Sequence, residues 1–183
     1  QDYLLKDLDI SIYRDLLSRL TEAETAQISF ELFGSGEPLD TLELPIELLA
    51  RNEWGGIGHM PELIAAFVQP NEPTIERLLK KTASVLRQNG KHSELNGYND
   101  GSKRVWELSS AIWTAVGAMA LDYSLPPASF EKEGQKIRSP LQISDTGIAT
   151  CMDTTVLFCS LLEQCNLNSI IVFTKGHAFA GVW

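Results

Sequence analysis

Hydrophobic and polar residues alternate along two neighbouring stretches near the start of the chain, AQISFELF (26–33) and DTLELPIELLA (40–50). Alternation of this kind is typical of a β-strand with one buried face. The segment between them, GSGEPL, is rich in turn-forming residues. The pattern therefore predicts a β-hairpin over 26–50, with Pro45 on an edge strand or at a break. A short helix is expected before it, in SIYRDLLSRLTEAE (11–24).

The middle of the chain has the spacing of helices. Pro61 suits the first helical position, so one helix is expected over 61–69, ending before Pro70. A second helix is predicted from Pro73, with Gly90 as the residue that follows its last turn. A third is predicted within 102–123. The second helix carries one apolar stripe, made of Ile75, Leu78, Leu79, Thr82, Val85 and Leu86.

Two other patterns on these helices are interpreted as structural. Trp106 and Trp113 are one heptad apart, and such an aromatic stripe is more typical of a core than of a cofactor site. The basic pairs Lys80–Lys81 and Lys103–Arg104 fall on helical patterns. We interpret them as solvent-exposed helix faces rather than as a nucleic-acid surface.

The last sixty residues contain a long loop followed by a regular order of elements. The segment 124–149 combines prolines with mixed charge, which forbids one continuous element. Loops longer than about 12–15 residues are uncommon and usually functional or disordered. This one leads directly into Cys151. A helix is predicted next (151–165), then a turn, a strand over 170–174, a second turn, and a strand that starts at His177.

Composition limits the class of protein. The chain has 183 residues, 44% of them hydrophobic, which suffices for a globular core. Its formal charge is −9 and its isoelectric point is near 4.8, so it should repel a phosphate backbone, and no direct nucleic-acid binding is expected. No membrane span or signal peptide is recognised, and no membrane partner is expected. The first and last residues suggest a piece excised from a longer protein.

The three cysteines fall within the one predicted helix of 151–165. Cys159 and Cys165 are about 9 Å apart along its axis, and a disulfide needs Cα atoms closer than about 7 Å. Three free thiols indicate a reducing compartment, so a cytoplasmic location is expected. Cysteines spread over about 21 Å of one helix cannot converge with His177 on one zinc ion. No metal site and no cofactor are expected.

Cys151 is the candidate nucleophile. Thr150 is a good N-cap and Asp153 stands three residues later, in a variant of the capping box. This places Cys151 at the first helical position, where unpaired N–H groups and the helix dipole favour a thiolate. The same N–H groups can hold a developing oxyanion. The alternative is that Cys151 is a small residue tolerated at a helix start.

His177 is the candidate base, because it follows a glycine and opens a strand shortly after the helix. If that strand packs beside the helix start, its ring reaches the sulfur and acts as base and then as acid. Otherwise it is an ordinary core or turn residue. Gln142, nine residues before Cys151, is a further oxyanion-donor candidate. Cys159 and Cys165 lie among Leu and Phe and are interpreted as inert packing thiols.

The segment TGIATCMDTTVLFCSLLEQCNLNSIIVFTKGHAFAGVW resembles the core of the transglutaminase-like superfamily of papain-type thiol enzymes. Cys151 matches the family's nucleophile, and His177, followed by Ala178 and Phe179, matches its base. The family's glycine two residues before the cysteine is Ala149 here. Its third residue, an Asp or Asn on the strand after the histidine strand, falls beyond Trp183.

The resemblance implies a transglutaminase-like or cysteine-proteinase core, in which the helix bearing the cysteine packs on an antiparallel sheet. The expected domains are a small N-terminal β-lobe over 1–52 and a transglutaminase-like α+β domain over 53–183, truncated at its C-terminal end. The expected activity is thiol-dependent acyl transfer or amide hydrolysis on a protein or peptide. Protease, amidase, transglutaminase and deamidase chemistry stay open, as does the oligomeric state.

The chain also resembles the leading segment of very large bacterial proteins that carry a superfamily-one helicase-type ATPase further on. The stretches that carry this resemblance are ELPIELLARNEWGG, MPELIAAFVQPN, PPASFEKEGQKIRSPLQI and KGHAFAGVW. It implies an alternative function, a catalytically inactive transglutaminase-like interaction module of a larger DNA-processing protein.

Overall fold

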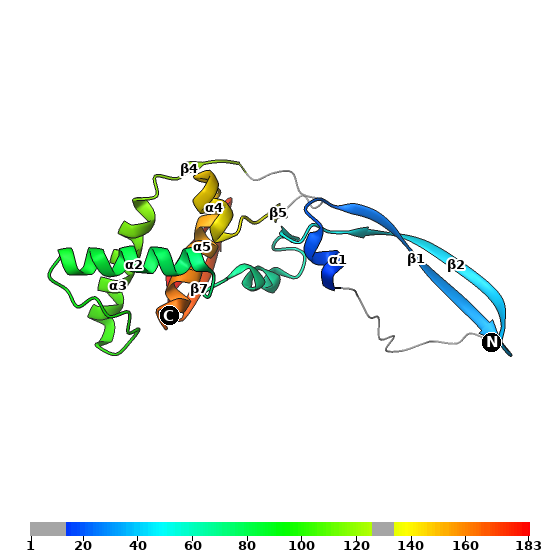
Figure 1. Cartoon of the computed structure of the whole chain (residues 1–183), viewed down its shortest axis with the longest axis horizontal. Coiled ribbons are helices and arrows are strands. Elements are labelled where there is room, and N and C mark those ends of the chain that lie inside the picture. Colours follow the sequence, from blue (N-terminus) through cyan, green and yellow to red (C-terminus); the bar gives the residue numbers. More distant parts are fainter. Residues whose placement is uncertain (1–13, 126–133) are drawn as a thin grey trace. The chain divides into compact units, whose positions relative to one another are not determined.

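A computed structural model describes residues 14–125 and 134–183 of the chain. The chain divides into two compact units, Gln1–Glu53 and Trp54–Trp183. Helices and small sheets are mixed in it, so the α+β class is confirmed (Figure 1). No helix among the described residues is long and apolar enough to cross a membrane.

The first unit is a short helix followed by a long β-hairpin. Helix α1 (Arg14–Arg19) ends sooner than the predicted 11–24 helix, whose first three residues lie outside the described ones. Strands β1 (Glu24–Gly34) and β2 (Glu37–Leu48) pair antiparallel, as predicted. The turn residues Ser35 and Gly36 have φ of 52° and 88°, and positive φ at both positions matches the right-handed twist of the strands.

Pro45 lies opposite Gln27 and does not interrupt β2. Each strand of a two-stranded sheet has one unpaired edge, so a missing N–H is tolerated there. The edge-strand alternative for Pro45 is therefore the correct one.

The second unit contains the remaining elements. Their bounds in chain order are β3 (Glu53–Trp54), which spans the boundary, η1 (Pro61–Phe67), α2 (Pro73–Gln88), α3 (Gly101–Gly117), β4 (Asp122–Tyr123), β5 (Gln135–Lys136), α4 (Pro140–Thr146), β6 (Ile148–Ala149), α5 (Cys151–Gln164), β7 (Ser169–Thr174) and β8 (His177–Val182). Strands β4 and β6 pair in parallel, and β7 and β8 pair antiparallel. Helices α2, α3 and α5 pack on one another, and α5 also packs on β7 and β8.

Several predicted elements have the expected place but a different extent. The predicted helix after Pro61 is a 3₁₀ helix that ends at Phe67. The described part of the predicted loop 124–149 contains α4 and the short strands β5 and β6. Helix α4 begins with a capping box between Ser139 and Gln142, which accounts for a short helix inside the predicted loop.

Helix α2 ends as its sequence predicts. Gly90 has φ of 67°, and its N–H donates to the carbonyl of Arg87 (3.0 Å). The next N–H, of Lys91, donates to the carbonyl of Leu86 (2.9 Å). This pair of bonds is a Schellman motif, in which glycine avoids the strain of a left-handed backbone. The predicted apolar stripe faces the core, with Val85 only partly buried.

Two adjoining groups of buried side chains hold the second unit together. The larger joins α2, α3, α4 and α5, and includes Ile75, Leu108, Ile112, Ile143, Leu157 and Leu161. The smaller joins the start of α5 to β8 and η1, and consists of Trp54, Ile64, Ile137, Met152, Val156 and Ala178. Helix α5 contributes to both, so it is the element around which this unit is packed (Figure 1).

Two interpretations of α3 are wrong. Trp106 and Trp113 are not core residues, since 74% and 69% of their surfaces are exposed. The core takes the other face of α3, and Trp113 stacks on Phe158 with ring centroids 5.5 Å apart. Arg104 is not solvent-exposed but 3% exposed, because the folded chain surrounds its guanidinium with acceptors.

Arg104 ties the segment between α2 and α3 to α3. Its guanidinium donates to the carbonyl oxygens of His92 (2.8 Å) and Glu94, and to the side chain of Asn96 (3.1 Å). It also pairs with Glu107 at 3.2 Å. A buried cation with this many acceptors is satisfied, and removing it takes a donor away from each of them.

We expect Arg104→Gln to lower the free energy of unfolding by roughly 2 kcal/mol, because the hydrogen bonds that the buried guanidinium donates to the carbonyls of His92 and Glu94 are lost. Urea denaturation followed by circular dichroism measures the change. Lys103→Gln is the matched control, since Lys103 precedes Arg104 on the same helix and is exposed. Equal losses in both variants would show that the buried position of Arg104 contributes nothing.

Candidate functional site

Cys151 begins α5, at the position that the sequence predicts. The Thr150 hydroxyl accepts a hydrogen bond from the Asp153 N–H (3.0 Å), and the Asp153 carboxylate accepts one from the Thr150 N–H (2.9 Å). The predicted capping box is therefore confirmed. Thr154 donates its N–H to the Thr150 carbonyl, which begins the helical hydrogen bonding. Helical geometry then leaves the N–H groups of Cys151 and Met152 free of intrahelical acceptors.

The cap is held by a residue that the sequence did not point to. Asp153 is fully buried, and its carboxylate accepts from the Arg138 backbone N–H and from the Arg138 guanidinium, both at 2.8 Å. Arg138 lies fifteen residues earlier, beside α4. The carboxylate thus fixes three things at once: the helix cap, the preceding segment and a partly buried cation. Its oxygens are occupied by these partners, so Asp153 is a structural group.

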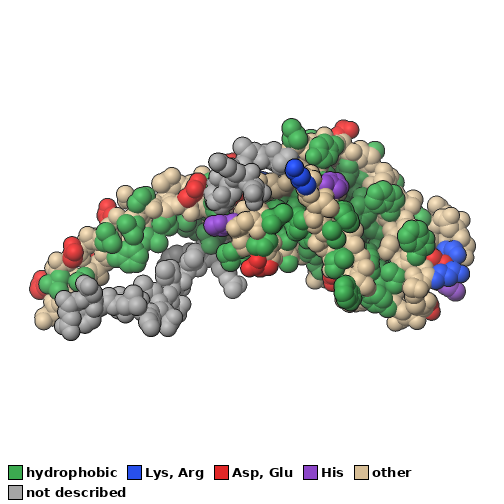
Figure 2. Space-filling view, turned by 180° about the vertical axis from the view of Figure 1, so that it is seen from behind, with side chains coloured by type: hydrophobic (Ala, Val, Ile, Leu, Met, Phe, Trp, Pro, Cys, Tyr) green, Lys and Arg blue, Asp and Glu red, His purple; other side chains and the backbone are tan. Residues whose placement is uncertain are grey.

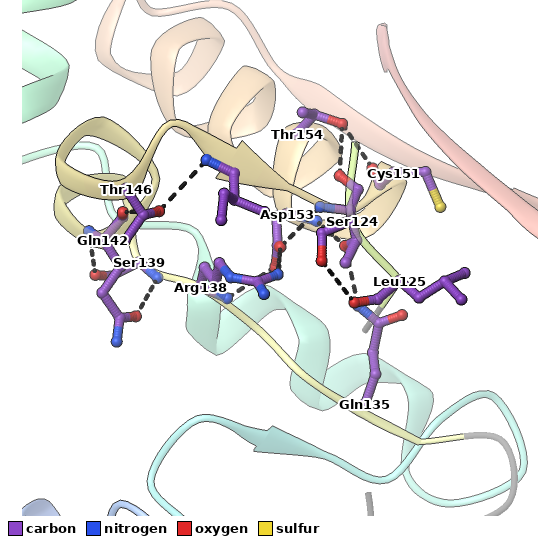
Figure 3. A network of polar contacts seen from close by, with 12 residues as sticks. Ser124, Leu125, Gln135, Arg138, Ser139, Gln142, Thr146, Cys151, Asp153 and Thr154 are labelled. Atoms are coloured by element: carbon purple, nitrogen blue, oxygen red, sulfur yellow. Dashed lines mark hydrogen bonds and ion pairs between the residues drawn. The ribbon is translucent and has the colours of Figure 1, made fainter. Parts of the chain in front are cut away.

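The sulfur of Cys151 is separate from this polar network. Figure 3 shows Sγ pointing away from Asp153 and Arg138. The residue is partly exposed, whereas Cys159 and Cys165 are buried. Burial raises the pKa of the Cys159 thiol and raises that of Cys165 to about 11. The interpretation of these two as packing thiols agrees with their burial, and at neutral pH they are protonated.

His177 is the first residue of β8, and this strand packs along α5. Ala178, which follows His177, lies in the same buried group as Met152, which follows Cys151. Further along β8, Ala180 and Val182 pack against the group that contains the later turns of α5. Strand and helix therefore start at the same end of their shared core.

A cavity of about 430 Å³ borders His177. It is mostly apolar and includes the stacked pair Trp113 and Phe158. Thr154 and Thr155 of the first turns of α5 also line it. These threonines are three and four residues after Cys151, so they share its helix face. Both hydroxyls donate to the Cys151 carbonyl, at 2.9 and 2.7 Å.

The structure thus brings together the elements that carry Cys151 and His177, but no formed pair. Within residues 14–125 and 134–183, no hydrogen bond joins Sγ to the imidazole, and none holds the ring. Gln142, the further oxyanion candidate, lies in the cap of α4, where its side-chain oxygen accepts from the Ser139 N–H (2.9 Å).

No metal centre is present in the described part of the chain. No three His, Cys, Asp or Glu side chains within it are grouped so that they could hold an ion. The arrangement that remains is a thiol at a capped helix start, an imidazole at the start of the adjacent strand, and an apolar cavity beside the imidazole.

We expect Arg138→Gln to lower the free energy of unfolding by roughly 3 kcal/mol, because it leaves the buried Asp153 carboxylate without its cation. Urea denaturation measures this change in the free energy of unfolding. Lys175→Gln, in the exposed turn between β7 and β8, removes the same charge without touching the cap. A loss in Arg138→Gln no larger than in this control would mean that the cap does not depend on the ion pair.

Comparison with known proteins adds no relative: no family model, curated protein or solved structure matches this chain.

Proposed function

We propose that the second unit is a thiol-dependent domain that transfers or hydrolyses acyl groups, with Cys151 as nucleophile and His177 as base. The observation that carries this proposal is the capped start of α5, which places a partly exposed cysteine at the first helical position. The packing of β8 along α5 supports it, because both elements begin at one end of the shared core.

In the proposed reaction, His177 takes the proton of the Cys151 thiol, and the sulfur attacks a carbonyl carbon. The N–H groups of Cys151 and Met152 stabilise the resulting oxyanion. His177 returns the proton to the leaving amine, which departs and leaves a thioester on Cys151. Water then hydrolyses the thioester, or an amine accepts the acyl group, with His177 again as base. Hydrolysis and amine transfer differ only in this last acceptor.

The cavity beside His177 favours a polypeptide as the proposed substrate. Six consecutive residues of β8, 177–182, line it, and within the described residues β8 pairs with β7 alone. Free N–H and C=O groups on a strand edge suit an extended peptide. The apolar wall with Trp113 and Phe158 suits an apolar side chain of that peptide.

Thiol labelling tests the nucleophile. Iodoacetamide should modify Cys151 at least about tenfold faster than Cys159 or Cys165, because Cys151 is partly exposed and the other two are buried. Cys159 and Cys165 serve as internal controls, since burial raises the pKa of both. Mass spectrometry of tryptic fragments measures each site. Labelling of Cys151 no faster than labelling of the two buried cysteines would contradict an accessible nucleophile.

Catalysis itself is tested with fluorogenic peptide amides, with and without a fluorescent primary amine as acceptor. Cys151→Ala should abolish turnover, and His177→Asn should lower it by about 10²–10⁴ because proton transfer is lost. Lys175→Gln, two residues from His177, is the control and should retain full activity. If Cys151→Ala is as active as the unchanged chain, the proposed nucleophile is wrong.

The alternative function is an inactive transglutaminase-like interaction module of a larger DNA-processing protein. The observation that favours it lies in the first unit, where the β1–β2 hairpin exposes large hydrophobic side chains. Cys151→Ala separates the two proposals within the full-length protein. Lost biological activity with unchanged stability supports the enzyme, and retained activity supports the module.

A further inference from the structure

The β1–β2 hairpin has one apolar face. Ile28 lies opposite Leu44, and Phe30 lies opposite Leu42. Side chains alternate between the faces of a strand, so residues two apart share a face. The face defined by these pairs, here called the hairpin face, is made of Ile28, Phe30, Leu32, Leu42, Leu44 and Ile46.

The hairpin face is largely uncovered. Leu32, Leu42 and Leu44 are 59%, 54% and 44% exposed. Figure 2 shows hydrophobic side chains along the hairpin with acidic ones between them. A two-stranded hairpin alone is only marginally stable in water, and a contiguous exposed apolar patch is typical of an interaction site. We therefore expect another protein segment to pack on the hairpin face.

The acidic charge of residues 1–53 indicates which kind of partner can pack on the hairpin face. Residues 1–53 contain twelve Asp and Glu but four Lys and Arg, so they hold −8 of the chain's −9. The hairpin itself, 24–48, has six acidic residues and no Lys or Arg. Two of the six lie on the hairpin face, one at each end: Glu24 two residues before Ala26, and Asp40 opposite Leu32. Eight residues of strand separate these ends, or about 27 Å.

These charges exclude several occupants. A second copy of the first unit would bring −8 against −8, and anionic lipid or nucleic acid would be repelled in the same way. Residues 54–183 contain twelve acidic and eleven basic side chains, so they are nearly neutral and offer no complement. A basic partner is the one that the charges favour.

We propose that the hairpin face binds an amphipathic helix of a partner protein, with an apolar stripe and Lys or Arg near both ends. A helix of about 18 residues spans 27 Å. Its stripe covers the apolar side chains, and its terminal cations pair with Glu24 and Asp40. Because binding needs neither Cys151 nor His177, this interaction is independent of the proposed chemistry.

A designed peptide tests the proposal with the whole 183-residue chain. The probe is a fluorescein-labelled 20-residue helix with a leucine stripe and lysines at both ends, and the control peptide has glutamates in place of the lysines. Fluorescence anisotropy should show saturable binding of the lysine peptide alone, weakening as salt is raised. Absence of binding, or equal binding of both peptides, overturns the proposal.

Matched variants locate the contact. Leu42→Ser should weaken binding by about tenfold or more, whereas Thr41→Ser, on the reverse face, should leave it unchanged. Asp40→Asn should weaken it by about two- to fivefold, and more than Glu43→Gln, which removes the same charge from the reverse face. Equal effects of Asp40→Asn and Glu43→Gln would mean that the peptide is attracted by net charge alone, which contradicts a defined site.

Photocrosslinking separates the possible occupants. Benzoylphenylalanine at position 42 should crosslink to the lysine peptide, and at position 41 it should not. Crosslinks within one chain that persist when the peptide is added would show that the hairpin face is covered internally. Crosslinked dimers would show that a second copy covers it. Either result overturns the proposal and leaves the proposed Cys151 chemistry untouched.

Discussion

The start of α5 depends on one buried carboxylate. Asp153 has no solvent exposure, and its two oxygens accept hydrogen bonds from the Thr150 N–H, the Arg138 N–H and the Arg138 guanidinium. A carboxylate can be buried only when its charge is paired and its lone pairs are used, and this one meets both conditions. The direction and starting residue of α5 follow from it. The position of Cys151, and with it any chemistry proposed for the thiol, follows in turn.

The three cysteines in α5 and at its C-cap differ in exposure because of their positions along the helix. Cys159 and Cys165 lie on the buried faces, where loss of solvation raises the pKa of both thiols. Cys151 lies one residue inside the cap, partly exposed, with free N–H groups nearby. Among the three cysteines, Cys151 is therefore the one to propose as a nucleophile, because the other two are enclosed.

The sequence was sufficient wherever the determining interaction is local. The Thr150–Asp153 cap and the Gly90 helix end are set by residues within a few positions of one another, and the hairpin turns within the predicted segment 34–39. The order of helix and strands after Cys151 follows from periodicity, for the same reason. In each case the residues that decide the structure stand next to it in the chain.

Contacts between residues far apart in the chain could not be predicted from the sequence. Arg138 pairs with Asp153 across fifteen residues, and nothing in its neighbours marks it as the partner. The Arg104 side chain was expected in solvent, but it is buried. Its burial depends on carbonyl groups of a segment ten to twelve residues away, which the helical pattern around Arg104 does not reveal. Trp106 and Trp113 were expected in the core. A heptad spacing shows that two residues share one face of a helix. It does not show whether the rest of the protein covers that face.

Net charge, likewise, is informative only once it is divided between the units. A total of −9 suggests an evenly acidic protein, yet residues 54–183 are nearly balanced and the hairpin holds no basic residue at all. The proposed thiol site therefore sits in a unit without a strong field of either sign, so shape and hydrogen bonding rather than charge would select its substrate. The proposed attraction of a basic partner involves the hairpin, where acidic groups flank an exposed apolar face. Selection by shape in one unit and by charge in the other would let the two act on different molecules.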